Sequence, residues 1–157
     1  MLSGRVAMSI YTLPRFTRDF DFIVHLKPED VLVLMEEFKE GYYCNGDSVR
    51  EAVINKGMFN IIDHKSNYKA GFMILKDRKY RLTEFNRRRK TEFLDMRIYI
   101  VSPEDLILSK LTWIQDSKSA LQMEDIKTLK EIENIDWGYI ADWTGKLKIN
   151  TFGLLKK

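Results

Sequence analysis

The chain has 157 residues, 45% of them hydrophobic and 12% aromatic, and a formal net charge of +3. This length and composition favour a folded protein with a hydrophobic core and argue against disorder. No apolar run approaches the ~20 residues of a membrane-spanning helix, and a single cysteine, Cys44, excludes an intramolecular disulfide. Because one unpaired cysteine fits a reducing compartment, we expect a cytoplasmic protein without membrane contact.

The first predicted elements are a short helix or turn over residues 5–11 and a strand over about 18–26. Alternate side chains of a strand share a face, so an aromatic face is separated from a face that carries Asp19 and Asp21, roughly 6.5–7 Å apart. Two like charges this close are unfavourable unless a cation lies between them. The candidates for that counter-charge are a metal ion, an arginine or water alone.

A helix is predicted after this strand, because Pro28 suits a first helical position and the residues that follow it are acidic. Apolar residues at helical spacing continue this helix, and Gly41 ends it. Residues 58–63 and 68–75 have the pattern of two strands, and residues 64–67 between them predict a hairpin.

Residues 76–90 form a basic segment, with eight Lys or Arg residues against two acidic ones and hence a local charge of +6. Such a cluster is suited to the phosphates of a nucleotide or of RNA. The alternative interpretation is the solvated face of a helix. A further strand is predicted over about 95–101.

The last third of the chain is predicted to be helical. Ser102 is a good N-cap before Pro103, and the helix that they begin runs to about residue 116. A second helix spans about 119–133, and a third begins near Trp137. The aromatic residues of that third helix are expected to pack into the core.

Strands that come first and helices that come last predict an α+β fold, a mixed sheet backed by helices. We expect a single domain over residues 1–157. Its sheet-containing core spans residues 1–101, and its C-terminal helices span residues 102–157.

Two charged residues fall inside the apolar arcs of the predicted helices. Lys110 shares its arc with Trp113, and Asp125 lies within the arc of the next helix. Because a lone buried charge is costly, each of the two should have a partner. Either they pair with each other and join the two helices, or Lys110 faces a cleft that binds an anion and Asp125 orients the lysine or a metal.

The N-terminal segment SGRVAMSIYTLPRFTRDFDF resembles the start of a nucleotidyltransferase-fold family that includes AbiEii-type proteins. The family pattern is a small-residue turn, a short helix and then R-x-T-x-D-x-D. Further matches follow in the expected order, namely the hairpin, EFNRRR, SPEDLILSKL and LQMEDI. The matching residues are Ser3, Gly4 and Arg5 in the turn, Arg15, Thr17, Asp19 and Asp21 after the short helix, and Lys110 and Asp125 on the later helices.

The resemblance implies Mg²⁺-dependent transfer of a nucleotidyl group from a nucleoside triphosphate. Some relatives are toxins that modify tRNA beside an antitoxin, so tRNA, another RNA or a protein is the implied acceptor and an antitoxin-like protein an implied partner. Mg²⁺ would be held by carboxylates, and the triphosphate would meet a helix N-terminus and basic side chains. The implied metal ligands are Asp19 and Asp21, the nucleotide-binding residues are Ser3, Gly4, Arg5, Arg15, Thr17 and Lys110, and Asp125 would orient the site or assist deprotonation of the acceptor.

The sequence departs from the family pattern at the third carboxylate. The second hairpin strand usually carries an acid that completes the metal site and helps to deprotonate the attacking hydroxyl, and the aligned residue here is Gly71. General-base assistance is typically worth about 10²–10⁴-fold in rate. Asp63 is a poor substitute, because Asn60 is expected to face Gly71 and Asp63 would lie roughly 10 Å along the strand.

Two further departures lie at the N-terminus. Arg5 stands where relatives have a second small residue, so its side chain would either obstruct the phosphate turn or hold phosphate. The fold's first strand is nearly absent, so either the fold is trimmed, the start lies elsewhere, or another chain supplies the missing edge. An open edge there would invite pairing and a homodimer. Two hypotheses follow: an active Mg²⁺-dependent nucleotidyltransferase, or a catalytically degenerate domain that binds a nucleotide, RNA or a protein.

Overall fold

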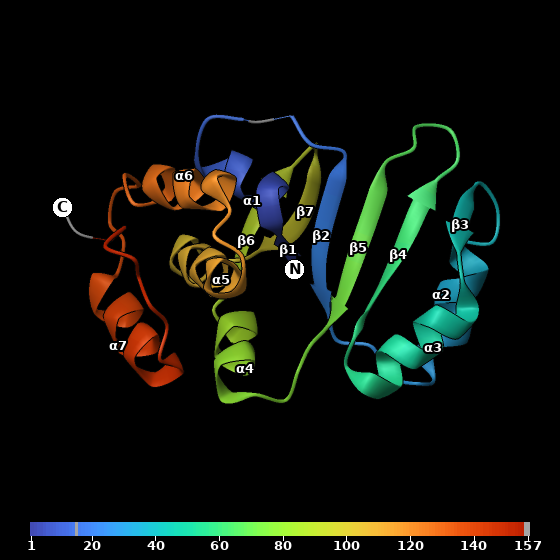
Figure 1. Cartoon of the computed structure of the whole chain (residues 1–157). Helices are drawn as coiled ribbons and strands as arrows, with labels where there is room; N and C mark the ends of the chain where they lie inside the picture. The colour runs from blue at the N-terminus through green and yellow to red at the C-terminus, as the bar shows by residue number, and fades with distance from the viewer. Residues whose placement is uncertain (15, 156–157) are drawn as a thin grey trace.

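The computed structural model describes residues 1–14 and 16–155, which form a seven-stranded mixed sheet with helices packed against it (Figure 1). The strand order is β3-β4-β5-β2-β1-β7-β6. The strands are β1 (Leu2–Ser3), β2 (Asp19–Val24), β3 (Tyr42–Cys44), β4 (Met58–Asp63), β5 (Lys69–Ile74), β6 (Arg89–Phe93) and β7 (Met96–Ile100). The helices are α1 (Gly4–Tyr11), α2 (Asp30–Glu37), α3 (Gly46–Asn55), α4 (Lys79–Asn86), α5 (Pro103–Asp116), α6 (Ala120–Leu129) and α7 (Trp137–Leu147).

The α+β fold is confirmed, with every strand before α5 and a helical last third. The hairpin of β4 and β5 has the predicted register, in which Asn60 lies opposite Gly71. Ser102 caps α5 as expected, because its hydroxyl accepts a hydrogen bond from the backbone N–H of Asp105. Within the described residues, no helix combines the length and the apolar character needed to cross a bilayer.

Five elements lie where the sequence pattern predicted none or left the type open. Helix α3 buries only three apolar side chains, and β1 and β3 have two and three residues. Helix α4 buries Glu84 beside Tyr80, so a carboxylate takes a place where the helical pattern requires an apolar residue. Strand β6 is charged and lies at one edge of the sheet, where charged side chains discourage pairing with other chains.

The position of β1 corrects the expectation of an open edge. This strand is short, as predicted, but it lies in the interior of the sheet, antiparallel to β2 and parallel to β7. Its backbone connects the two neighbours, since the amino group of Met1 donates to the carbonyl of Ile23 and Val101 donates to the carbonyl of Leu2. The edges of the sheet are β3 and β6, so the argument for a dimer through the first strand loses its basis.

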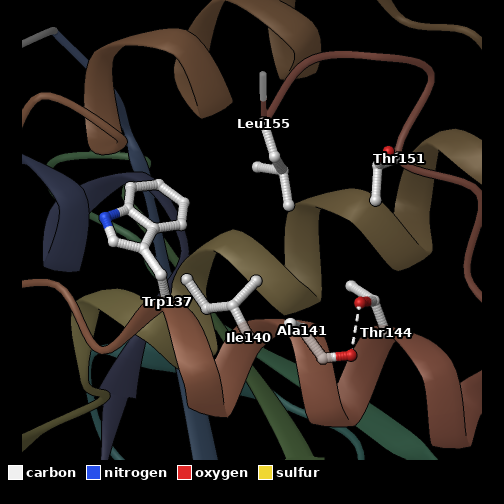
Figure 2. A pocket seen from close by; sticks show the side chains of 6 residues that line it. All are labelled: Trp137, Ile140, Ala141, Thr144, Thr151 and Leu155. Atoms are coloured by element: carbon white, nitrogen blue, oxygen red, sulfur yellow. Dashed lines mark hydrogen bonds between the residues drawn. The ribbon is translucent and has the colours of Figure 1, made fainter. Parts of the chain in front are cut away.

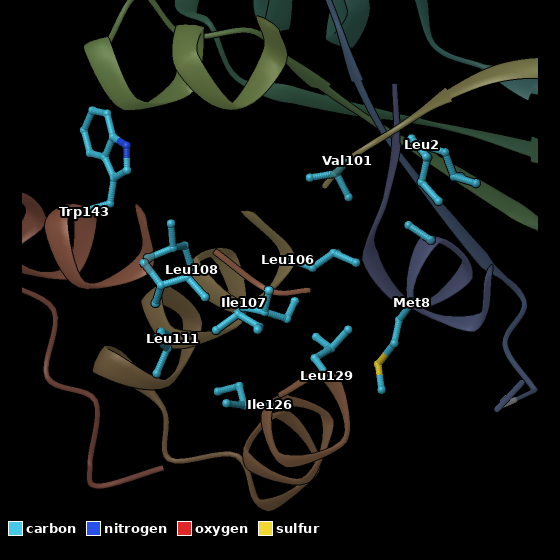
Figure 3. Packing of buried hydrophobic residues seen from close by; sticks show 14 of the residues in the cluster. Leu2, Met8, Val101, Leu106, Ile107, Leu108, Leu111, Ile126, Leu129 and Trp143 are labelled. Carbon is cyan, nitrogen blue, oxygen red and sulfur yellow. The ribbon is translucent and has the colours of Figure 1, made fainter. Parts of the chain in front are cut away.

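Two hydrophobic clusters hold the sheet between its helices. The larger one joins α1, α5, α6 and α7 to β1 and β7, and it is packed around fully buried leucine and isoleucine residues of α5 and α6 (Figure 3). The smaller one joins α2 and α3 to β4 and β5. Trp143 belongs to the larger cluster, and Trp137 and Tyr139 pack against it, as expected of the last helix.

Candidate functional site

A groove with a volume of about 330 Å³ lies between the sheet and α5, and it contains most of the residues singled out in the sequence. Strands β1, β2, β4 and β5 form one wall, and α1, α4, α5 and α6 contribute side chains to the rest. Four cationic and two acidic side chains line it, which gives a local charge of +2. These six are Arg5, Lys69, Arg81, Lys110, Asp19 and Asp21.

The two aspartates of β2 project into this groove from one face of the sheet, as the strand pattern predicted. Asp21 lies opposite Ser3 of β1 on one side and Gly71 of β5 on the other. Asp19 lies opposite Lys69, whose ammonium nitrogen is 3.2 Å from the Asp19 Oδ1 atom. A lysine on the neighbouring strand is therefore the nearby counter-charge, a candidate that the sequence pattern did not suggest.

The environment of Asp21 disfavours its charged form. Partial burial and the nearby Asp19 carboxylate raise the pKa of Asp21, while Lys69, Arg5 and Lys110 act in the opposite direction. An additional cation beside Asp21 would therefore stabilise the charged form of its carboxylate.

Gly4 determines how closely the start of α1 approaches Asp21. Its φ of +64° is in the left-handed region, which glycine tolerates best. A Cβ atom at this position would lie 2.0 Å from the Asp21 Oδ2 atom. The first N–H groups of α1 are thus placed beside the carboxylate pair, where helix termini favour anions.

The space beside Gly71 is compatible with the third carboxylate that the family pattern has there. A Cβ atom on Gly71 would lie 3.4 Å from the Asn60 Oδ1 atom and 3.5 Å from the Asp21 Oδ1 atom. Asp63 instead accepts hydrogen bonds from the backbone of Lys65 and Ser66 and closes the hairpin turn. The judgement that Asp63 is a poor substitute agrees with this geometry.

Lys110 and Asp125 pair with each other, and the lysine also lines the groove. The Lys110 ammonium nitrogen lies 2.7 Å from the Asp125 Oδ2 atom and 3.0 Å from the Gln122 Oε1 atom. Asp125 is fully buried and is not among the groove-lining side chains, so within the described residues it acts on the groove through the lysine. The two interpretations of this pair are therefore compatible.

The remaining residues that match the family pattern have separate places. Ser3 and Arg5 line the groove. The Thr17 hydroxyl accepts a hydrogen bond from the backbone N–H of Asp19, at 3.2 Å, and so fixes the start of β2. Arg15 lies outside the described residues.

Arg81 reaches the groove from α4 and was not assigned to the site from the sequence. Its guanidinium donates to Glu84, at 2.8 Å, and Glu84 is fully buried. Burial raises the pKa of Glu84, and Arg81 acts in the opposite direction. The signal in the sequence was the i, i+3 spacing of an arginine and an acid within the basic segment.

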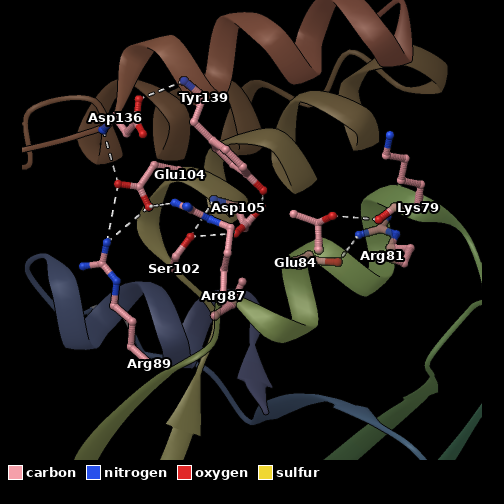
Figure 4. A network of polar contacts seen from close by, with 12 residues as sticks. Lys79, Arg81, Glu84, Arg87, Arg89, Ser102, Glu104, Asp105, Asp136 and Tyr139 are labelled. Carbon is pink, nitrogen blue, oxygen red and sulfur yellow. Dashed lines mark hydrogen bonds and ion pairs between the residues drawn. The ribbon is translucent and has the colours of Figure 1, made fainter.

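Two other basic side chains of this segment, Arg87 and Arg89, belong to a polar network around buried acids between α4, β6, α5 and α7 (Figure 4). Glu104 pairs with Arg87 and Arg89, each at 3.3 Å, and also accepts from the backbone N–H of Asp136. Asp105 accepts hydrogen bonds from the hydroxyls of Ser102 and Tyr139, each at 2.7 Å. Arg87 and Arg89 of the basic segment therefore have partners within the protein.

A larger cavity of about 460 Å³ lies between α7 and the C-terminal segment. Figure 2 shows that aliphatic, threonine and tryptophan side chains line it, without a charged group among them. Phosphate and metal chemistry need charged ligands. The smaller groove is therefore the better candidate for a catalytic or nucleotide-binding site.

Comparisons with known proteins agree with this geometry. A family model described as nucleotidyltransferase of unknown function (DUF6036) matches residues 3–149. The crystal structure of the lincosamide antibiotic adenylyltransferase LnuA, bound to lincomycin, is similar in fold, with a TM-score of 0.54, 14% sequence identity and coverage of 83% of this chain and 85% of that chain. No curated protein sequence matched the chain.

Proposed function

The chain belongs to this family of nucleotidyltransferases of unknown function. We propose that its groove binds a nucleoside triphosphate with Mg²⁺ and transfers the nucleotidyl group to an acceptor hydroxyl, whose oxygen bonds to the α-phosphorus as the hydroxyl loses its proton and pyrophosphate leaves. One observation carries the proposal: a single groove brings two adjacent carboxylates together with four cationic side chains. Carboxylates hold the metal in such chemistry, and cationic side chains bind the phosphates.

The charge of the groove matches this ligand. A nucleoside triphosphate carries about four negative charges at neutral pH, and Mg²⁺ neutralises about two of them. The complex that remains, with a charge of about −2, complements the +2 of the groove side chains. A free, uncomplexed anion would instead meet Asp19 and Asp21 at close range.

The donor set fits Mg²⁺. The described residues contain no cluster of three or more His, Cys, Asp or Glu residues placed to hold a metal. Mg²⁺ is commonly bound by one or two carboxylates together with substrate phosphates, so Asp19 and Asp21 would suffice as the protein ligands. When bound there, Mg²⁺ would neutralise charge on the transferred phosphoryl group.

The residues of the chain itself would orient the triphosphate. An ammonium group has three donors, and two of those of Lys110 are directed to Asp125 and Gln122. The third is available to a phosphate oxygen in the groove that Lys110 lines. Asp125 is thus proposed as a positioning residue, and its burial argues against a direct role in deprotonating the acceptor.

A second candidate function follows from Gly71. Gly71 leaves Asp21 without the third carboxylate of the family pattern on the neighbouring strand, and Lys69 already compensates part of the acidic charge. Loss of general-base assistance lowers rates by about 10²–10⁴-fold. A domain that binds a nucleotide, RNA or a protein without catalysis is therefore the alternative.

The candidate acceptors of the nucleotidyl group are of two kinds, macromolecules and small molecules. The AbiEii-type resemblance favours tRNA, another RNA or a protein as the acceptor, with an antitoxin-like partner. The structure similar in fold is that of a lincosamide antibiotic adenylyltransferase bound to lincomycin, so a small molecule is a further candidate acceptor. The test is label transfer from each of the four α-labelled nucleoside triphosphates, with Mg²⁺, to bulk tRNA, to protein and to small alcohols. Transfer that Asp19→Asn abolishes supports the enzyme, whereas triphosphate binding without transfer to any of these acceptors supports the alternative.

A further inference from the structure

Trp113 is placed in a way that core packing does not explain. It falls within the apolar arc of α5, so the sequence pattern predicts a buried side chain, but 64% of it is exposed and that prediction is wrong. Trp143 shows what a packed tryptophan looks like in this protein, since it is 7% exposed and its ring lies 5.0 Å from that of Tyr80. Trp113 instead lines the groove.

A second large apolar side chain is exposed in the same groove. Met58 of β4 is 60% exposed and pairs across the sheet with Met73 of β5, which also lines the groove. Ile23 of β2 lies beside Met73 in the register of the two strands. These three residues form an apolar floor next to the charged residues.

The groove therefore has a charged part and an apolar part. Ile23 and Met73 each lie two residues further along their strands than Asp21 and Gly71, a step of roughly 6.5–7 Å. On the opposite wall Trp113 is three residues from Lys110, which places the two side chains on one face of α5, with Cβ atoms about 5–6 Å apart. A molecule that is anionic at one end and flat and apolar at the other would fit both parts.

We infer that Trp113, together with Met58 and Met73 of the same groove, forms the subsite for the base of a purine nucleoside triphosphate. This inference rests on the proposed function. Aromatic stacking on Trp113 offers a flat surface for any base and favours the larger purine ring system. The methionines adapt their shape and make favourable contacts with aromatic rings.

If Trp113 stacks on the base, the contribution of the base to the binding affinity can be measured separately from that of the phosphates. Calorimetric titrations of the purified chain with MgATP and with magnesium tripolyphosphate measure the two contributions. Trp113→Ala is expected to weaken MgATP binding by about tenfold to a hundredfold, to leave tripolyphosphate binding unchanged, and to abolish any preference for ATP over CTP. Trp113→Phe should restore part of the MgATP affinity, because a smaller ring still stacks.

Trp137→Phe is the matched control, since Trp137 lines the other cavity and both affinities should stay as in the unaltered chain. Equal affinity of the unaltered chain for MgATP and tripolyphosphate would overturn the inference while leaving the proposed function intact. An unchanged MgATP affinity in Trp113→Ala, or an equal loss for both ligands, would overturn it as well. If neither MgATP nor magnesium tripolyphosphate binds to the unaltered chain, the proposed function and the inference are both overturned.

Discussion

Two clusters of charged residues lie on either side of α5, and they differ in how their charges are compensated. In the buried network Glu104 and Asp105 are almost completely enclosed, and arginines, hydroxyls and a backbone N–H are directed at them. In the groove Asp19 and Asp21 are partly exposed, and Lys69 lies within ion-pair distance of Asp19. The acids of the first cluster are paired by groups of the protein itself, whereas the second cluster has an excess of cations and a carboxylate with a raised pKa.

The difference separates charges that hold the fold from charges that are available for chemistry. Buried polar groups stabilise a fold only when all of them have partners. Perturbed carboxylates in a groove are typical of functional sites. Arg81 connects the two clusters, because it lines the groove while its partner Glu84 is buried.

The largest expected effect is on the buried network. Glu104→Ala removes the shared partner of Arg87, Arg89 and the Asp136 N–H, and it should lower the free energy of unfolding by about 2–4 kcal/mol in urea denaturation. Glu131→Ala is the control, since its carboxylate is 75% exposed and should contribute less than about 0.5 kcal/mol. Similar losses for both variants would show that the network is not what holds these helices.

The next largest effect is expected at the turn before α1. Gly4→Ala introduces a Cβ 2.0 Å from Asp21 and requires a left-handed backbone, so MgATP affinity in calorimetry should fall at least tenfold, and stability by about 1–3 kcal/mol. Gly145→Ala has no atom within 4 Å of the added Cβ and lies within α7, so it should raise stability by about 0.5–1 kcal/mol. Normal MgATP binding by the Gly4→Ala variant would contradict the proposed phosphate turn.

We expect Arg81 to contribute more to the affinity of a nucleotide that has more phosphates. Arg81→Ala is expected to weaken MgATP binding about tenfold, since a hydrogen bond to a charged group contributes about 1.5–3 kcal/mol and water compensates part of it. AMP binding should change less. Lys79→Ala removes a neighbouring charge on α4 that does not line the groove and should change neither. If Arg81→Ala and Lys79→Ala weaken MgATP binding equally, the effect comes from the lower positive charge of the protein, and Arg81 makes no specific contact with the ligand.

Gly71→Asp tests whether a third carboxylate is all that the groove lacks for Mg²⁺ binding and nucleotidyl transfer. The added side chain fits with a small shift of Asn60, and a third carboxylate should tighten Mg²⁺ binding several-fold in calorimetry. If the native chain is degenerate, transfer should appear in this variant. Gly57→Asp, outside the groove, is the control.

The smallest effect is expected from the raised pKa of Asp21. A carboxyl group whose pKa is raised on folding stabilises the fold when protonated, and this contribution is lost as pH rises. Asp21→Asn should therefore raise the melting temperature at neutral pH, by about 1–2 °C, while it weakens Mg²⁺ binding. In the unaltered chain Mg²⁺ binding should weaken on acidification at a higher pH than for an ordinary aspartate. A lower melting temperature for Asp21→Asn would contradict this electrostatic account.

The sequence was sufficient for the main elements and for the outline of the site. Alternation predicted the common face of Asp19 and Asp21, and the apolar arcs identified Lys110 and Asp125 as a pair that needs partners. The hairpin length predicted the register that places Asn60 opposite Gly71. Each of these features depends on local periodicity.

The features that the sequence did not predict depend on contacts between distant segments. Lys69 meets Asp19 because β5 is parallel to β2, and Arg81 reaches the groove because α4 turns back beneath α5 (Figure 1). A helical wheel places Trp113 on the apolar face of α5, but it does not show whether that face packs into the core or lines a groove. The interior position of β1 also required the sheet order, since two residues carry no topological pattern.

The most direct test of the central claim is calorimetric titration of the chain with ATP in the presence and absence of Mg²⁺, repeated with Asp19→Asn. The account predicts binding that is strongest with Mg²⁺ and loses most of that enhancement in the variant, because Asp19 and Asp21 are the proposed metal ligands. ATP binding with an affinity that neither Mg²⁺ nor the Asp19→Asn substitution changes, or no binding at all, would contradict it.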